Sequence, residues 1–211
     1  MLFDQPEKLQ PDDVLDWHAL CAAGLDCERL NVRECLLNQS PVPAYLRDAL
    51  QGATSKEVDS YFLSCKQELD LAVVLTLIAA AEARIRLDAR RRVEATANAG
   101  NNTLAGRLKL LRAGVNKDWA VPLYEDGILD AWKDYTATLA AIPGQDQARI
   151  RTCIGNLKNM LHVRHWVAHG RYWELRNGIG HYPPVTVAKV VTSLYKALSE
   201  AAISGGLMAF R

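Results

Sequence analysis

Hydrophobic positions recur along nearly the whole chain at the three- and four-residue spacing of amphipathic helices. Few stretches alternate with period two, and the one β-branched cluster, residues 185–191, continues into a helical pattern. The pattern therefore predicts an all-α fold. A helical bundle is the arrangement expected to bury so many apolar stripes.

The limits of the expected helices follow from their boundary residues. Pro11 opens a first helix that should stop at Gly24, and a second helix should cover residues 25–37. A short helix over residues 44–51 should end at Gly52. Further helices are expected over residues 54–95, 104–113, 123–141, 145–169 and 186–202.

The longest of these helices begins at a capping box. Thr54 is followed three residues later by Glu57, so each side chain can bind a backbone N–H group near the other. Residues 71–81 are apolar on nearly all sides, which predicts a central place in the fold. Residues 1–52 are expected to form an N-terminal helical extension or cap, and residues 53–211 the main helical domain.

Composition narrows the class of protein. The chain has 211 residues, of which 49% are apolar and 23% charged, as in soluble globular proteins. We expect no signal peptide, and the apolar run over residues 71–81 is too short to span a membrane, which needs roughly 20 residues. The five cysteines include no CxxC pair, which argues against a zinc knuckle and a disulfide framework and favours a reduced, cytoplasmic protein.

Charge is unevenly distributed. Residues 1–70 carry 6 basic and 13 acidic side chains, whereas residues 71–211 carry 19 basic and 11 acidic ones. This asymmetry suits a basic surface for an anionic partner, but long helices also carry solvated charges of no special function. The sequence leaves both interpretations open.

The segment from Arg164 to Gly170 carries the strongest candidate chemistry. His169 can transfer a proton near neutral pH, and Arg164 can hold a phosphate through its forked donors. On a regular helix the two residues lie about 140° apart. Gly170 can end the helix and so allow the His169 side chain to turn towards a substrate that Arg164 also reaches.

This segment resembles the signature of the HEPN superfamily. The matching residues are Arg164, the polar His165 directly after it, and His169 after four intervening positions. The resemblance implies a helical bundle that forms a homodimer and brings two such motifs into one cleft. It also implies a metal-independent endoribonuclease without a cofactor, acting as a toxin or phage-defence effector under the control of an antitoxin or regulatory protein.

In this hypothesis RNA is cleaved by attack of its 2′-hydroxyl group. Arg164 binds the scissile phosphate, His169 transfers the proton and His165 is a supporting polar group. Basic and aromatic residues near the motif are the candidate RNA ligands. They are Lys158, Arg171, Tyr172 and Arg176.

Glu82 is an acidic residue within the most apolar part of the chain. A carboxylate in that position needs a partner, and the sequence offers Arg86 one turn later or, across the fold, Arg164 or His169. We expect Glu82 to be a supporting residue of the site.

The alternative to a nuclease is a non-catalytic helical module that binds RNA, a nucleotide or a protein partner. A metal-dependent hydrolase is disfavoured because no HExxH or HxH motif is present.

Overall fold

The computed structural model describes residues 5, 8–95, 100, 103–117, 120–138, 144–168 and 182–200. Within these ranges the chain forms seven α-helices and one 3₁₀ turn and contains no strand, so the predicted all-α fold is confirmed. The elements are α1 (Pro11–Leu37), η2 (Ala44–Leu46), α2 (Arg47–Leu50), α3 (Ser55–Ala95), α4 (Leu104–Ala113), α5 (Ile128–Thr138), α6 (Gly144–Ala168) and α7 (Pro184–Glu200).

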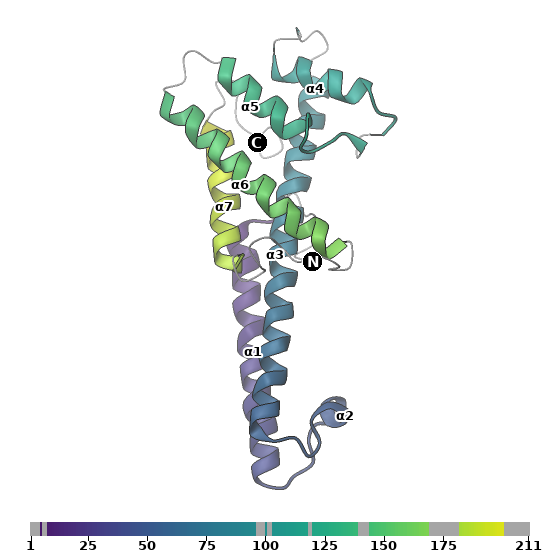
Figure 1. Cartoon of the computed structure of the whole chain (residues 1–211), viewed down its shortest axis with the longest axis vertical. Helices are drawn as coiled ribbons and strands as arrows, with labels where there is room; N and C mark the ends of the chain where they lie inside the picture. The colour runs from purple at the N-terminus through teal and green to yellow at the C-terminus, as the bar shows by residue number, and fades with distance from the viewer. Residues whose placement is uncertain are drawn as a thin grey trace.

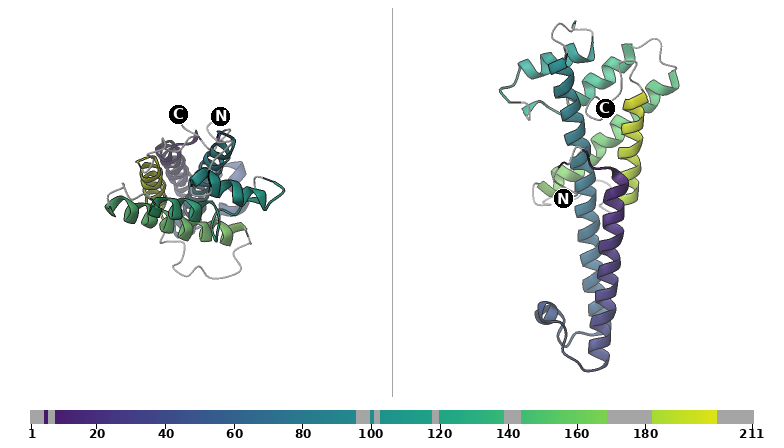
Figure 2. Two further views of the ribbon diagram at one scale, coloured as in Figure 1. Left: turned by 90° about the horizontal axis from the view of Figure 1, so that it is seen from above. Right: turned by 180° about the vertical axis from the view of Figure 1, so that it is seen from behind.

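The helices form a long stalk and a wider head (Figure 1). In the stalk, α1 lies antiparallel to the first half of α3, and α2 lies at the far end (Figure 1). The second half of α3 continues into the head, where it contacts α4, α5, α6 and α7. Figure 2 shows the same arrangement from behind, with α6 crossing one face of α3.

The middle of α3 is the centre of the main hydrophobic core, as its sequence predicts. Most of its apolar side chains are buried, and every helix of the head contributes side chains to the same core cluster. A segment that is apolar on all sides has to be surrounded by other elements, which explains why the head gathers here. The fully buried residues include Leu77, Ile78, Ile85, Leu129, Trp132, Leu157 and Leu194.

The basic stretch of α3 that follows also faces the interior in places. Arg92 Nε lies 2.9 Å from Asp88 Oδ2 in a buried ion pair, and its guanidinium lies 4.8 Å from the centre of the Trp132 ring. The Arg84 guanidinium lies 3.9 Å from the centre of the Tyr195 ring on α7. Burial lowers the pKa of Arg84 and raises the pKa of Tyr195 to about 12.

Helix α1 is continuous, so the expectation of two helices separated at Gly24 is wrong. A single glycine within a helix costs only about 1 kcal/mol relative to alanine. Ion pairs with α3 hold α1 on both sides of that glycine. His18 Nε2 lies 2.6 Å from Asp70 Oδ1, and Lys66 Nζ lies 2.6 Å from Asp26 Oδ2.

Helix α5 begins at Ile128, five residues later than expected, whereas the limits of α4 are as predicted. The backbone before α5 turns sharply, with left-handed φ angles of 56° at Glu125 and 61° at Asp126. At Gly127 a Cβ atom would lie 2.2 Å from the carbonyl oxygen of Pro122. The chain therefore makes a tight turn here that only glycine can complete, and the helix cannot start before it.

The stalk is held differently along its length. A small apolar cluster closes its far end, whereas residues 15–31 of α1 and residues 63–70 of α3 include no buried side chain. In that middle section, partly exposed polar contacts connect the two helices beside the half-buried Leu15, Trp17 and Leu69. The far cluster consists of Val32, Val42, Leu46, Leu50, Val58 and Phe62.

The predicted capping box at the start of α3 is confirmed. The backbone N–H of Thr54 donates to Glu57 Oε2 at 2.7 Å, and the backbone N–H of Glu57 donates to Thr54 Oγ1 at 3.3 Å. The hydrogen bond from the Thr54 backbone lowers the pKa of the Glu57 carboxyl group. Two donors at the beginning of a 41-residue helix are thereby satisfied.

We expect Thr54→Ala to lower the free energy of unfolding by about 1 kcal/mol, since it removes the cap. Ser64→Ala is the control, because Ser64 lies within α3 and only donates to the Ser60 carbonyl.

Glu57→Gln should also lower the free energy of unfolding. This loss of stability should be present above the ordinary pKa of 4.5 and disappear in acid, where Glu57 of the wild type is protonated. Urea denaturation at pH 7 and pH 3 measures both effects, and an equal loss for Ser64→Ala would contradict the assignment.

Candidate functional site

Arg164 lies in the last turns of α6, where its side chain reaches α3. Its side chain is 52% exposed, and its Nε atom lies 3.2 Å from Oε2 of Glu82 on α3. This contact engages only one of the five N–H donors of the guanidinium group. The terminal amino groups can therefore still bind an anion from solvent.

Glu82 has two arginine partners at once. Its side chain is only 13% exposed, and its Oε1 atom accepts a hydrogen bond of 2.9 Å from Arg86 Nε while Oε2 faces Arg164. Arg86 also donates from its NH1 group to the carbonyl oxygen of Val121 at 2.7 Å. Both partners that the sequence offered on described residues, Arg86 and Arg164, are thus in contact with Glu82.

Other predicted site residues on α6 have different surroundings. His165 is exposed one position after Arg164, in the last turn of the described helix. Lys158 is half-buried, and its Nζ atom lies 2.6 Å from Asp130 Oδ1 on α5. Its ammonium group therefore connects two helices of the head. Its proposed role as an RNA ligand stays a prediction.

Several predicted site residues lie outside the part of the chain that the structure describes. They include the proposed proton-transfer residue and most of the proposed RNA ligands. The geometry of the site therefore rests on Arg164, His165 and Glu82. The residues outside the described ranges are His169, Arg171, Tyr172 and Arg176.

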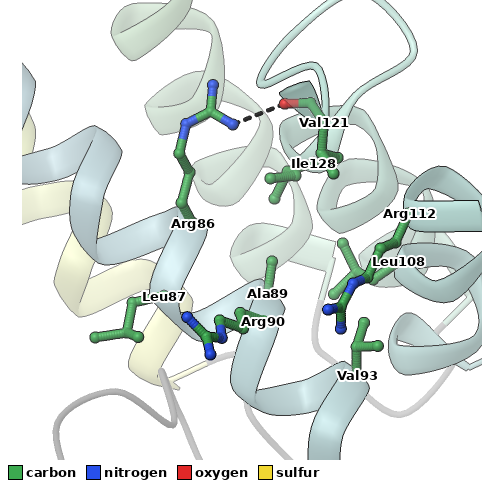
Figure 3. A pocket seen from close by; sticks show the side chains of 9 residues that line it. All are labelled: Arg86, Leu87, Ala89, Arg90, Val93, Leu108, Arg112, Val121 and Ile128. Carbon is green, nitrogen blue, oxygen red and sulfur yellow. Dashed lines mark hydrogen bonds between the residues drawn. The ribbon is translucent and has the colours of Figure 1, made fainter. Parts of the chain in front are cut away.

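A pocket lies next to Arg86. It is lined by residues of α3 and α4, by Val121 and by Ile128 at the start of α5 (Figure 3). Its volume is about 250 Å³. Three arginines line it, Arg86 and Arg90 from α3 and Arg112 from α4, among aliphatic side chains. Arg112 was missed by the sequence reasoning, because no local pattern indicates that a residue of α4 lies beside the basic stretch of α3.

The positive charges around this pocket are partly balanced. Arg90 Nε lies 2.8 Å from Glu94 Oε1 in an ion pair whose members are both about half exposed. The hydrogen bond from Arg90 lowers the pKa of Glu94, and the charges of Arg112 and Arg91 act in the same direction. Glu94 is therefore held in its charged form beside the arginines of this end of α3.

The described residues contain neither a cluster of metal ligands nor a membrane-spanning helix. No three His, Cys, Asp or Glu side chains come together there as metal ligands. No helix in that part of the chain is long and apolar enough to cross a bilayer. All five cysteines have free thiols.

Comparison with protein-family models, with curated proteins and with solved structures finds no match to this chain.

We expect Glu82→Ala to lower the free energy of unfolding by about 1–3 kcal/mol, because Arg86 is only 26% exposed and would lose its carboxylate partner. Glu94→Ala is the matched control, since it removes a more exposed pair with the same spacing and should cost less. Chemical denaturation of the two variants at pH 7 measures the difference. Equal losses would show that Glu82 contributes no more than a surface ion pair.

Proposed function

We propose that this chain is a metal-independent endoribonuclease of the HEPN type. In this proposal it is a cytosolic toxin or phage-defence effector that acts as a homodimer, under the control of an antitoxin or regulatory protein. The observation that carries the proposal is the setting of Arg164. It is half exposed, it is held through one nitrogen by a nearly buried carboxylate, and it belongs to the RX4H sequence.

A fixed guanidinium suits the charge that develops during phosphoryl transfer. The contact with Glu82 restricts the Arg164 side chain, so little order has to be gained when a phosphate binds. The 2′-oxygen then forms a bond to phosphorus as the bond from phosphorus to the 5′-oxygen breaks. The products are a 2′,3′-cyclic phosphate and a 5′-hydroxyl group.

The proton transfers are assigned to His169, with His165 as a supporting polar group beside Arg164. One histidine supplies a rate factor of roughly 10²–10⁴ through acid–base catalysis. The reaction needs a proton removed from the 2′-hydroxyl and another delivered to the 5′-oxygen. A homodimer offers a second histidine for the second transfer, which is why the proposal includes two copies of the chain.

A second candidate function is a module that binds RNA without cleaving it. The arginine-lined pocket next to Arg86 favours this candidate, since binding alone needs a basic surface and no proton transfer. Both functions share Arg164 as a phosphate ligand. They differ in what the loss of His169 does.

We expect the purified protein to cleave cellular RNA in EDTA and to leave cyclic-phosphate ends. Arg164→Ala and His169→Ala should each reduce the rate at least about 100-fold, because each removes a group acting on the reacting phosphate. His162→Ala and Arg151→Ala, at exposed positions of α6, are the controls and should retain activity. Gel analysis of 5′-labelled RNA gives the rates.

Two outcomes would count against the nuclease. Wild-type protein that binds RNA and leaves it intact would establish the binding module instead. Cleavage that persists in both Arg164→Ala and His169→Ala would show that neither residue belongs to the reaction.

A further inference from the structure

The pocket beside Arg86 has an apolar floor and a basic rim. The floor is formed by buried aliphatic side chains of α3, α4 and α5, including Ala89, Leu108 and Ile128. The guanidinium groups of Arg86, Arg90 and Arg112 stand around it (Figure 3). None of the described residues that line the pocket carries a carboxylate group. Such a site suits a flat, weakly polar ring that is attached to an anionic group.

The size of the pocket limits its occupant. Sites for drug-sized ligands have volumes of roughly 300–1,000 Å³. At about 250 Å³ this pocket lies just below that range, so it accommodates one ring system more readily than an extended ligand. A single nucleobase is an occupant of this kind.

The pocket is adjacent to the proposed phosphate site. Arg86 and Arg164 bind the two oxygens of the same Glu82 carboxylate, at 2.9 Å and 3.2 Å. The Glu82 carboxylate therefore joins one arginine of the pocket to the arginine assigned to the scissile phosphate. Successive groups along a single RNA strand can occupy two sites this close together.

We propose that the pocket receives the unpaired nucleobase next to the phosphate that Arg164 binds. This inference rests on the proposed nuclease function and adds to it a site that selects the substrate. Bases of single-stranded RNA bind by stacking on planar groups and by hydrogen bonds to their edges, and arginine side chains provide both. Because the arginine side chains of the rim supply only donors, the acceptor-rich edge of guanine is the preferred partner.

Cleavage of a mixed-sequence RNA tests this site. We expect wild-type protein to cut next to one type of base, guanine above the others. Val93→Trp fills the half-buried edge of the pocket, and Arg112→Ala removes one guanidinium group from the rim. Each should reduce cleavage at the preferred sites about tenfold, which is the value of one base contact, while cleavage at other sites changes little.

Matched controls separate these effects from general damage. Leu75→Trp adds bulk at another half-buried position of α3, and Lys109→Ala removes a charge from α4 three residues before Arg112. Neither residue lines the pocket, so both variants should keep the preference. Thermal unfolding of all four variants establishes that they are folded.

The outcomes distinguish the two proposals. Folded Val93→Trp and Arg112→Ala proteins that cut RNA with the rates and preference of the wild type would overturn the pocket assignment and leave the nuclease standing. Wild-type protein that cuts without any base preference would do the same. Wild-type protein that neither cuts nor binds RNA would overturn the proposed function, and the base pocket with it.

Discussion

The burial of the middle of α3 is the constraint on which the head depends. Its residues 71–81 are apolar on nearly all sides, so no single partner helix could cover them. Four helices of the head and the first part of α1 all contribute side chains to the core cluster to which these residues belong. Since α6 is one of these helices, the packing that buries α3 also determines where Arg164 lies.

Glu82 lies where α3 changes from an apolar to a basic helix. A carboxylate that is only 13% exposed is costly without compensating charge, and two arginines from different helices provide it. Of these three groups, Arg86 lines the pocket, Arg164 is the proposed phosphate ligand, and Glu82 contacts both. A stabilising requirement of the fold and an arrangement suited to anion binding are therefore met by the same residues.

Local rules were enough for much of the fold. The capping box at Thr54, the limits of α4 and the central place of residues 71–81 depend on neighbours in sequence, and all three were predicted. The expected helix end at Gly24 does not occur, because contacts with α3 outweigh the low helix propensity of glycine. The late start of α5 depends on a close approach of Gly127 to Pro122, which no helical periodicity records.

The candidate site could likewise be predicted from the sequence only in part. Glu82 could be singled out because a charge in an apolar stretch needs a partner, and both arginines considered on described residues are in contact with it. The pocket could not be predicted, since Arg112 joins the arginines of α3 only through the packing of α4. The proposed role of His169 depends on residues outside the described ranges, so it stays a prediction.

The stalk combines two kinds of attachment that respond differently to solvent. Apolar clusters fasten it at the head and at the far end, whereas ion pairs with partly exposed members connect its middle section. Pairs of this kind weaken as ionic strength rises, whereas burial of apolar side chains does not. Salt therefore acts on the contact between α1 and α3 in the middle of the stalk more than at its two ends.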